Sequence, residues 1–548
     1  MELDKARRYF QKECNGWWLI SMVGAGVILL PILYVFLSLF QSPNENWIHI
    51  RQYLLQTYTV NTIILVTVTG LLTAFIGVLL AWLIASYDFP FKRFFRFTLI
   101  FPLAIPPYIA AYTYRNMLSY TGVVQSTLRN QLDIHINSEL LTLTSVSGSI
   151  FIFTFFLYPY VYLITLAFLE KQSAAYIENA RMLGQKPVPI FFKIILPLSR
   201  PAIIGGVVLV VYEVLSDYGV TSYFGVHTFT TAIFQTWFGM YDVDSAMRLA
   251  SWLMIMIVGL VFIERLLRKR RRYHLPRQSR SIVPVRLKGG KAVAASLVCG
   301  TIVSIGFFIP VIQLLAWAGM TFHTIWDSQF FELLYQTVYI AVIATAIILV
   351  FSTIIANVTR SPSTFSYILS KIVTAGYSIP GAIIAIGVLA LFILLDGWLA
   401  PVYEWMELGE APLILSLSLV MLVVGYVIRY MAMGYNAMEV GFEKVGNRYT
   451  ESSRMLGHGK TTTFFKVELP LLKGALLSGF LLTFIEIFKE LPLALLLRPF
   501  NFETLATKTY QYANDERIYE AAIPSLIIIA VSVLSVIVVQ LLDRRVKE

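Results

Sequence analysis

Four acidic side chains inside apolar segments are the residues of this sequence best placed to do chemistry. Glu213 and Asp217 lie towards the end of one apolar run, and Glu486 and Glu490 lie towards the end of another. A spacing of four residues puts both members of a pair on one face of a helix. Carboxylates in a membrane span are costly and usually face a polar cavity, and hard cations take oxygen ligands. We therefore expect a cation pathway; alternatively the acids are structural, with Lys489 neutralising one of them.

Motifs for enzyme chemistry are otherwise lacking in the sequence. It contains no HExxH or GxSxG, its six His residues are scattered, and Cys14 and Cys299 form no CxxC pair. The string from Gly457 to Thr461 ends like a phosphate-binding loop, but Arg454 stands where that loop needs a glycine, in a helical context and not after a strand. We predict that the chain is not an enzyme and holds no nucleotide, cofactor or tightly bound metal. An intramembrane protease or transferase is the rival class, but repeated acid pairs suit a symmetric pathway better.

The elements that position these acids are predicted to be membrane-spanning helices. Of the 548 residues, 57% are hydrophobic and 14% are charged, and the mean hydropathy is +0.71, whereas about a quarter of a soluble domain is charged. The predicted fold class is an all-α polytopic membrane protein. Because about 20 apolar residues cross a bilayer, the spans are expected at approximately 17–40, 58–86, 95–118, 143–169, 201–224, 246–266, 292–320, 333–358, 366–396, 412–435, 474–497 and 520–542.

Basic residues indicate the orientation of these spans. Of the 43 Lys and Arg residues, 34 fall in alternate connections, a set that includes both termini. Cytoplasmic loops carry such an excess, so both termini are predicted to be cytoplasmic. The net charge of +11 then reflects membrane topology, and the expected surroundings are the lipid bilayer and not nucleic acid. The most basic connection, 266–291, is read as a linker that fixes topology, with an anionic-lipid or partner patch as the alternative.

An internal repeat divides the chain into two halves. Residues 178–197 read ENARMLGQKPVPIFFKIILP and residues 451–470 read ESSRMLGHGKTTTFFKVELP, in register at a constant offset of 273. The same offset relates the two acid pairs, and a weaker echo relates Ile105-Pro106 to Ile379-Pro380. Two six-span halves enclose a central path with pseudo-twofold symmetry. The predicted division is a first half at 1–265 with its loop at about 170–200, the linker at 266–291, and a second half at 292–548 with its loop at about 443–473.

Each repeated loop is expected to begin as a short helix. A glycine, Gly184 in the first copy and Gly457 in the second, ends this helix in a left-handed conformation. A second short amphipathic piece with paired phenylalanines follows, and the Leu-Pro step turns the chain into the next span. Such a helix suits a groove on another protein; alternatively it rests on the bilayer surface. The match of two long segments at equivalent sites favours docking.

The spacing of these loops resembles the EAA loop of the permeases of binding-protein-dependent ABC importers, which are MetI-like proteins. Asn179 and Ser452-Ser453 depart from the alanines of that motif but are small and compatible with a helix. The resemblance implies coupling helices in a cleft of a separate ATPase, two copies of which bind ATP and Mg. The residues to which it assigns ATPase coupling are Glu178, Ala180, Gly184, Leu196 and Pro197 in the first copy, and Glu451, Ser453, Gly457, Leu469 and Pro470 in the second.

The resemblance also extends to the substrate. Residues 216–231, SDYGVTSYFGVHTFTT, and residues 497–506, LRPFNFETLA, are similar to the ferric-iron permeases of the Fbp and Sfu type, whose fused two-half architecture matches the whole chain. This implies a bacterial inner-membrane importer of ferric iron that works by alternating access. Thiamine permeases share the fusion and the loops and remain an alternative, and a secondary transporter is a second one. A periplasmic binding protein is implied, for which candidate contacts are Asp242, Asp244, Asp515 and Glu516.

Overall fold

The computed structural model describes residues 16–545 apart from 136, 138–140, 172–178, 181, 269–282, 362, 408–412 and 417. Over these residues the chain is almost entirely helical, which confirms the predicted all-α fold class. The first half contains α2 (Gly16–Leu37), η1 (Ser38–Phe40), α3 (Glu45–His49), η2 (Ile50–Leu54), α4 (Leu55–Ser86), β1 (Tyr87–Asp88), α5 (Lys92–Thr98), η3 (Phe101–Ala104), α6 (Pro107–Leu118), α7 (Val123–Leu132), α8 (Val146–Lys171), α10 (Pro187–Ile190), η5 (Phe191–Ile195), α11 (Leu196–Ser216), α12 (Gly219–Tyr223), α13 (Phe229–Met240) and α14 (Val243–Arg268).

The second half repeats this order of elements. After β2 (Val285–Arg286) come α15 (Gly290–Val303), η6 (Ser304–Phe308), α16 (Ile309–Ile325), α17 (Ser328–Thr359), α18 (Thr364–Ser378), α19 (Gly381–Trp405), α20 (Leu419–Val445), α21 (Arg448–Met455), α22 (Lys460–Thr463), η7 (Phe464–Glu468), α23 (Leu469–Leu471), α24 (Lys473–Phe488), α25 (Pro492–Leu497), α26 (Leu505–Asn514) and α27 (Ile518–Arg545). Helices α4 and α17 are both 32 residues long and begin 273 positions apart. The same offset relates α8 to α20 and α12 to α25.

The membrane spans differ from the predicted set at the repeated Ile-Pro steps, among other places. Within the described chain, ten helical segments are long and apolar enough to cross a membrane, or up to twelve if two bent pairs each count as one span. The predicted span 95–118 is two pieces that meet at 92°, and the predicted span 366–396 is interrupted between α18 and α19. Both interruptions fall at the repeated Ile-Pro step. Proline disfavours helical backbone in the residue before it and lacks an amide hydrogen, so these spans do not exist as single helices.

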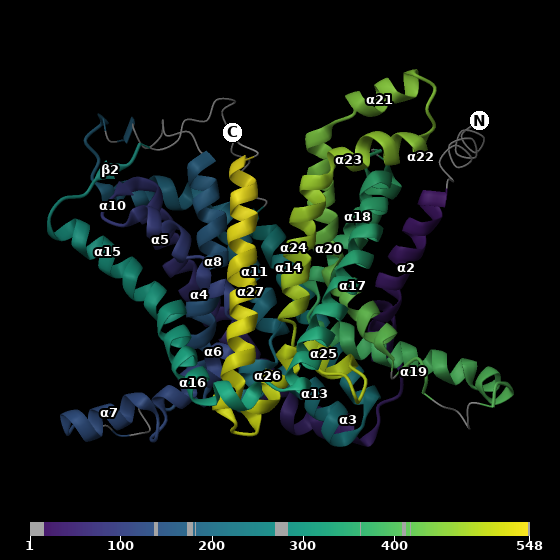
Figure 1. Cartoon of the computed structure of the whole chain (residues 1–548), viewed down its shortest axis with the longest axis horizontal. Coiled ribbons are helices and arrows are strands. Elements are labelled where there is room, and N and C mark those ends of the chain that lie inside the picture. Colours follow the sequence, from purple (N-terminus) through teal and green to yellow (C-terminus); the bar gives the residue numbers. More distant parts are fainter. Residues whose placement is uncertain are drawn as a thin grey trace.

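The two halves exchange their first helices. Helix α2 belongs to the first half in sequence but packs against α17, α18 and α19 of the second. Helix α15 begins the second half but packs against α5, and its Cys299 lies in an apolar cluster with Leu80 and Tyr158 of the first half. Strand β1 pairs in parallel with β2, with Tyr87 opposite Val285. Each half is therefore completed by the other, and the described ends of the chain lie at the same end of the molecule as α10 and α21 (Figure 1).

A glycine contact sets how closely α11 approaches α8. A Cβ built on Gly206 would lie 2.7 Å from the Cα of Val161, a backbone atom that cannot rotate away. Replacing Gly206 with Val is therefore expected to force α11 off α8, at a cost of roughly 1–3 kcal/mol for overpacking. Thermal unfolding of the purified chain should show a lowered midpoint. The matched control is Gly259→Val on α14, where a Cβ meets nothing within 4 Å; equal midpoints in the two variants would contradict the prediction.

Candidate functional site

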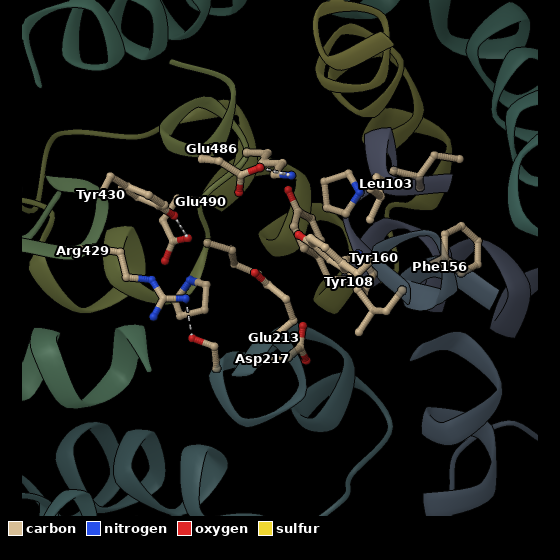
Figure 2. Close-up of a pocket in the computed structure, with 18 of the residues that line it drawn as sticks. Leu103, Tyr108, Phe156, Tyr160, Glu213, Asp217, Arg429, Tyr430, Glu486 and Glu490 are labelled. Atoms are coloured by element: carbon tan, nitrogen blue, oxygen red, sulfur yellow. Dashed lines mark hydrogen bonds and ion pairs between the residues drawn. The ribbon is translucent and has the colours of Figure 1, made fainter. Parts of the chain in front are cut away.

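A polar cavity of about 90 Å³ lies between the two halves, where interrupted helices from both of them meet. A cavity needs roughly 10–15 Å³ of such free volume to hold one water. This cavity therefore has room for several waters or for a partly hydrated ion. Figure 2 shows its acidic and basic side chains gathered around the space, on elements from both halves. The polar lining consists of Glu213, Ser216, Asp217, Glu486, Glu490, Arg429, Lys489, Tyr108, Tyr160, Tyr377 and Tyr430.

The predicted acid pairs are brought to this cavity, but not on continuous helices. Helix α11 ends at Ser216, and Asp217 has extended backbone, with φ −73° and ψ 129°. Helix α24 likewise ends at Phe488, before Glu490. The prediction that each pair shares one face of a single helix is therefore wrong. The physical reason is capping: a carboxylate that accepts a backbone amide hydrogen at the start of a new helix competes with continuation of the old one.

Asp217 and Glu490 accept these hydrogen bonds from equivalent positions of the repeat, each one residue before the N-cap of the following helix. An oxygen of Asp217 accepts a hydrogen bond from the amide of Val220 at 2.8 Å, at the start of α12. An oxygen of Glu490 accepts one from the amide of Leu493 at 3.2 Å, at the start of α25. Glu490 also accepts a hydrogen bond from the hydroxyl of Tyr430. The structural interpretation of the acids thus applies to the second member of each pair, although both still line the cavity.

Glu213 and Glu486 are the first members of the pairs, and their partners differ. Glu486 forms an ion pair with Lys489 at 2.8 Å, the local neutralisation considered from the sequence. Glu213 accepts a hydrogen bond from the hydroxyl of Tyr377 at 3.4 Å. Among the ion pairs between described residues, none includes Glu213. Of the four carboxylates, Glu213 is therefore the one most available to a cation in the cavity.

Two cationic side chains enter the cavity, and both come from the second half. At the offset of 273 the counterpart of Arg429 is Phe156 and that of Lys489 is Ser216. A terminal nitrogen of Arg429 donates to the hydroxyl of Ser216 at 2.7 Å, and the other donates to the carbonyl of Ile379. Arg429 was not predicted, although an arginine inside an apolar span is a recognisable sign of a functional site. The acids are thus symmetric and the cations are not, and four carboxyl groups stand against two cationic side chains in the lining.

Tyrosine hydroxyls complete the oxygen-rich lining, and they also escaped prediction. The hydroxyl of Tyr108 is buried with no hydrogen-bond partner. Tyrosine occurs at every depth of a membrane protein core, so nothing in the sequence marked these four. Among the residues that the structure describes, no three His, Cys, Asp or Glu side chains are grouped to hold a metal ion. The arrangement is that of a small polar cavity lined with oxygen atoms.

The candidate coupling residues lie far from this cavity, at the end of the molecule that carries α10 and α21 (Figure 1). Glu178 lies outside the described residues. The small residues Ala180 and Ser453 are buried, while Glu451 is exposed on α21. Gly184 and Gly457 have φ of +74° and +85°, which confirms the left-handed conformation predicted for both. Beside them the apolar side chains of Met182, Leu183, Met455 and Leu456 are between 79% and 90% exposed.

The Leu-Pro steps do not act as predicted. In the first copy Leu196 and Pro197 begin α11 inside one continuous helical segment, Val188–Ser216, so the chain does not turn there. In the second copy the chain bends by 71°, but between Leu471 and Lys473, after the Leu469-Pro470 step. Proline is tolerated in the first turn of a helix, where its missing amide hydrogen is not needed. The two repeated segments therefore reach their acid-bearing helices by different paths.

Of the four acids predicted to contact a binding protein, Asp242 has a structural role. It accepts hydrogen bonds from the side chains of Asn44 at 2.7 Å and Asn46 at 2.9 Å, and from the amide of Ser245 at 3.0 Å. Burial opposes ionisation of Asp242, but these hydrogen bonds outweigh it and hold the pKa of the carboxyl below its usual value. Asp242 thus fastens α3 to the start of α14.

Comparison with known proteins places both halves in one family. Residues 74–272 and 350–548 each match the family described as binding-protein-dependent transport system inner membrane component. The chain is 23% identical over 517 residues to an Fe(3+)-transport system permease protein of Haemophilus influenzae, which covers 93% of this chain and 94% of that protein. It is 26% identical over 230 residues to a sulfate transport system permease protein of Escherichia coli, covering 40% of this chain and 76% of that protein. A second sulfate permease, from Salmonella typhimurium, is 27% identical over 195 residues.

Proposed function

Because the chain belongs to the family of binding-protein-dependent transport system inner membrane components, we propose that it is the ABC importer permease through which ferric iron enters the cell. The observation that carries the choice of substrate is the charge of the central cavity, where four carboxylates face two cations. Ferric iron is a hard cation, and carboxylate and phenol oxygens are hard ligands.

Sulfate is the competing substrate, because sulfate permeases also match the chain. A negatively charged cavity repels a dianion, and anion sites in proteins gather cations and backbone amides instead. Here Lys489 is already paired with Glu486, and both terminal nitrogens of Arg429 donate to protein oxygens, the hydroxyl of Ser216 and the carbonyl of Ile379. The similarity to the Fe(3+) permease also spans both halves, whereas each sulfate permease covers less than half of this chain. Both observations favour the cation.

The same proposal also assigns the partners of the chain and its orientation in the membrane. The two glycine-ended segments contact two separate ATPase subunits, which bind ATP and Mg, and both termini lie on that cytoplasmic side of the inner membrane. A periplasmic binding protein delivers the ion to the opposite side, and the two halves, 1–265 and 292–548, form the pathway between them. In the first half, one helical segment joins Val188 in the coupling region to Ser216 at the cavity. ATPase closure therefore moves Glu213 directly, as alternating access requires.

Uptake by reconstituted vesicles tests the substrate. The purified chain is combined with its ATPase and binding protein, and entry of labelled iron, thiamine and sulfate is followed with and without ATP. Iron is expected to accumulate only with ATP and binding protein, because the cavity attracts cations. Accumulation of thiamine alone or sulfate alone would overturn the iron assignment and leave the importer class intact. A vesicle without binding protein is the control for passive leakage.

A further inference from the structure

Arg360 ties together the parts of the second coupling segment. It follows directly on α17 and donates hydrogen bonds to the carboxylate of Glu468 at 2.6 Å and the side chain of Asn447 at 3.0 Å. Glu468 ends η7, on the path to α24, while Asn447 precedes α21. The guanidinium of Arg360 also lies over the ring of Phe442 on α20, 4.7 Å from the ring centre. One side chain thus joins four elements.

Thr450 closes this arrangement from α21. Its hydroxyl donates to the same oxygen of Glu468 that accepts from Arg360, and it lies 3.4 Å from a guanidinium nitrogen of Arg360. The side chain of Glu468 is 3% exposed. A buried carboxylate with a charged partner and a second donor is confined to one geometry, because losing either donor leaves polar atoms unpaired. Arg360, Glu468 and Thr450 are called the clasp below.

The residue types of the first half do not allow the same ion pair at the equivalent positions. At the offset of 273, Tyr87 stands in place of Arg360 and Ile195 stands in place of Glu468. The ring of Tyr87 packs on Trp82 with ring centres 5.7 Å apart, and its backbone pairs with Val285. Ile195 is buried in an apolar cluster. An isoleucine side chain makes no charged hydrogen bond, so Ile195 does not impose the directional constraint that Glu468 imposes in the second half.

The two halves also differ in how the coupling segment reaches its acid-bearing helix. In the first half one helical segment runs from Val188 to Ser216. Movement of the coupling region at Val188 therefore reaches the cavity along this segment. In the second half the 71° bend before Lys473 interrupts that path, and movement at α21 is lost at the bend unless another contact carries it. Arg360 offers a route that avoids the bend, because it connects the start of α21 to the end of the membrane-spanning helix α17.

We propose that the clasp is the positioning device that passes ATPase-driven movement of the second coupling segment to the membrane spans, a task that the straight helix performs in the first half. The proposal rests on the proposed contact of these segments with the ATPase, and not on the identity of the transported ion. It assigns Arg360, Glu468 and Thr450 to coupling, beside the residues of the repeated motif. The two halves then couple to the same ATPase by different means.

The chain itself supplies the test variant. In Arg360→Tyr/Glu468→Ile the clasp is replaced by the residues that the first half uses at these positions. An apolar pair of this kind often preserves the stability of a buried ion pair, whereas removing one partner does not. The complex is expected to assemble and hydrolyse ATP, while substrate imported per ATP falls by roughly fivefold, the lower range of a coupling effect. An unchanged ratio in an assembled complex would overturn the proposal.

A milder variant covers the case in which the double variant fails to assemble. Thr450→Val removes the hydroxyl from the clasp and keeps the shape of the side chain, and the import ratio is expected to fall by about twofold. Its matched control is Thr374→Val on α18, whose hydroxyl bonds only to carbonyls of its own helix, Ser370 and Lys371. Equal ratios in the two valine variants would refute the clasp. A wild-type complex that hydrolyses ATP but imports neither iron, thiamine nor sulfate would instead refute the proposed function.

Discussion

Replacing both Glu213 and Glu486 with Gln is expected to abolish iron uptake in reconstituted vesicles while the complex still assembles. Two unit charges about 4 Å apart interact by roughly 4 kcal/mol at an effective dielectric constant near 20, and 1.4 kcal/mol corresponds to about tenfold in an equilibrium constant. Losing even one carboxylate that contacts the ion should therefore reduce uptake by at least about tenfold. Glutamine keeps the size of the side chain, so packing around the cavity is retained.

The single variants discriminate between the two acids. Glu213→Gln is expected to impair uptake more than Glu486→Gln, because Lys489 already neutralises Glu486 at 2.8 Å while Glu213 has only a hydroxyl partner at 3.4 Å. Glu332→Gln serves as the control, since Glu332 is exposed at the far end of α17 and bonds to Gln336 of its own helix. Labelled-iron uptake and co-purification with the ATPase are measured together. Normal uptake by the double variant would remove Glu213 and Glu486 from the pathway.

Replacing Gly184 and Gly457 together with Val is expected to uncouple ATP hydrolysis from transport. Both glycines have positive φ, a conformation that costs an ordinary L-residue roughly 1–2 kcal/mol and a β-branched residue more. A Cβ at either position meets nothing within 4 Å, so the effect comes from the backbone and not from a clash. The valine variants should redirect the segments that carry Met182 and Met455, and thereby change the surface offered to the ATPase.

A nearby glycine provides the control for this prediction. Gly459 lies in the same loop as Gly457 and also has open space around its Cα, but its φ is −68°, which valine adopts readily. Gly459→Val should therefore keep the ratio of iron imported to ATP hydrolysed, while Gly457→Val lowers it. Gly457→Asn should restore part of the ratio, because asparagine tolerates the left-handed conformation. Wild-type coupling in the double valine variant would show that the helix stops are not required.

The sequence by itself determined the features that depend on short stretches of chain. The repeat at an offset of 273 predicted two related halves, and helix bounds such as those of α4 and α17 follow it. The positive φ of Gly184 and Gly457 was predicted because a helix stop is set by neighbouring residues. The acids were brought to one cavity as expected, since a buried carboxylate must find a polar environment wherever its span lies. Hydropathy and local backbone rules were enough for these.

Only the tertiary structure decided which groups meet across the two halves. At the end of α11 the hydroxyl of Ser216 is held by Arg429, 213 positions away. Likewise, the clasp joins Arg360 to Glu468 across 108 positions, and α2 packs on the opposite half. The free energies of continuing a helix and of ending it differ by only a few hydrogen bonds. A contact with a residue far away in the sequence can therefore decide which of the two occurs. Such a contact stabilises the protein only when both partners are in place. Because the partners lie far apart in the sequence, neither residue alone predicts the contact.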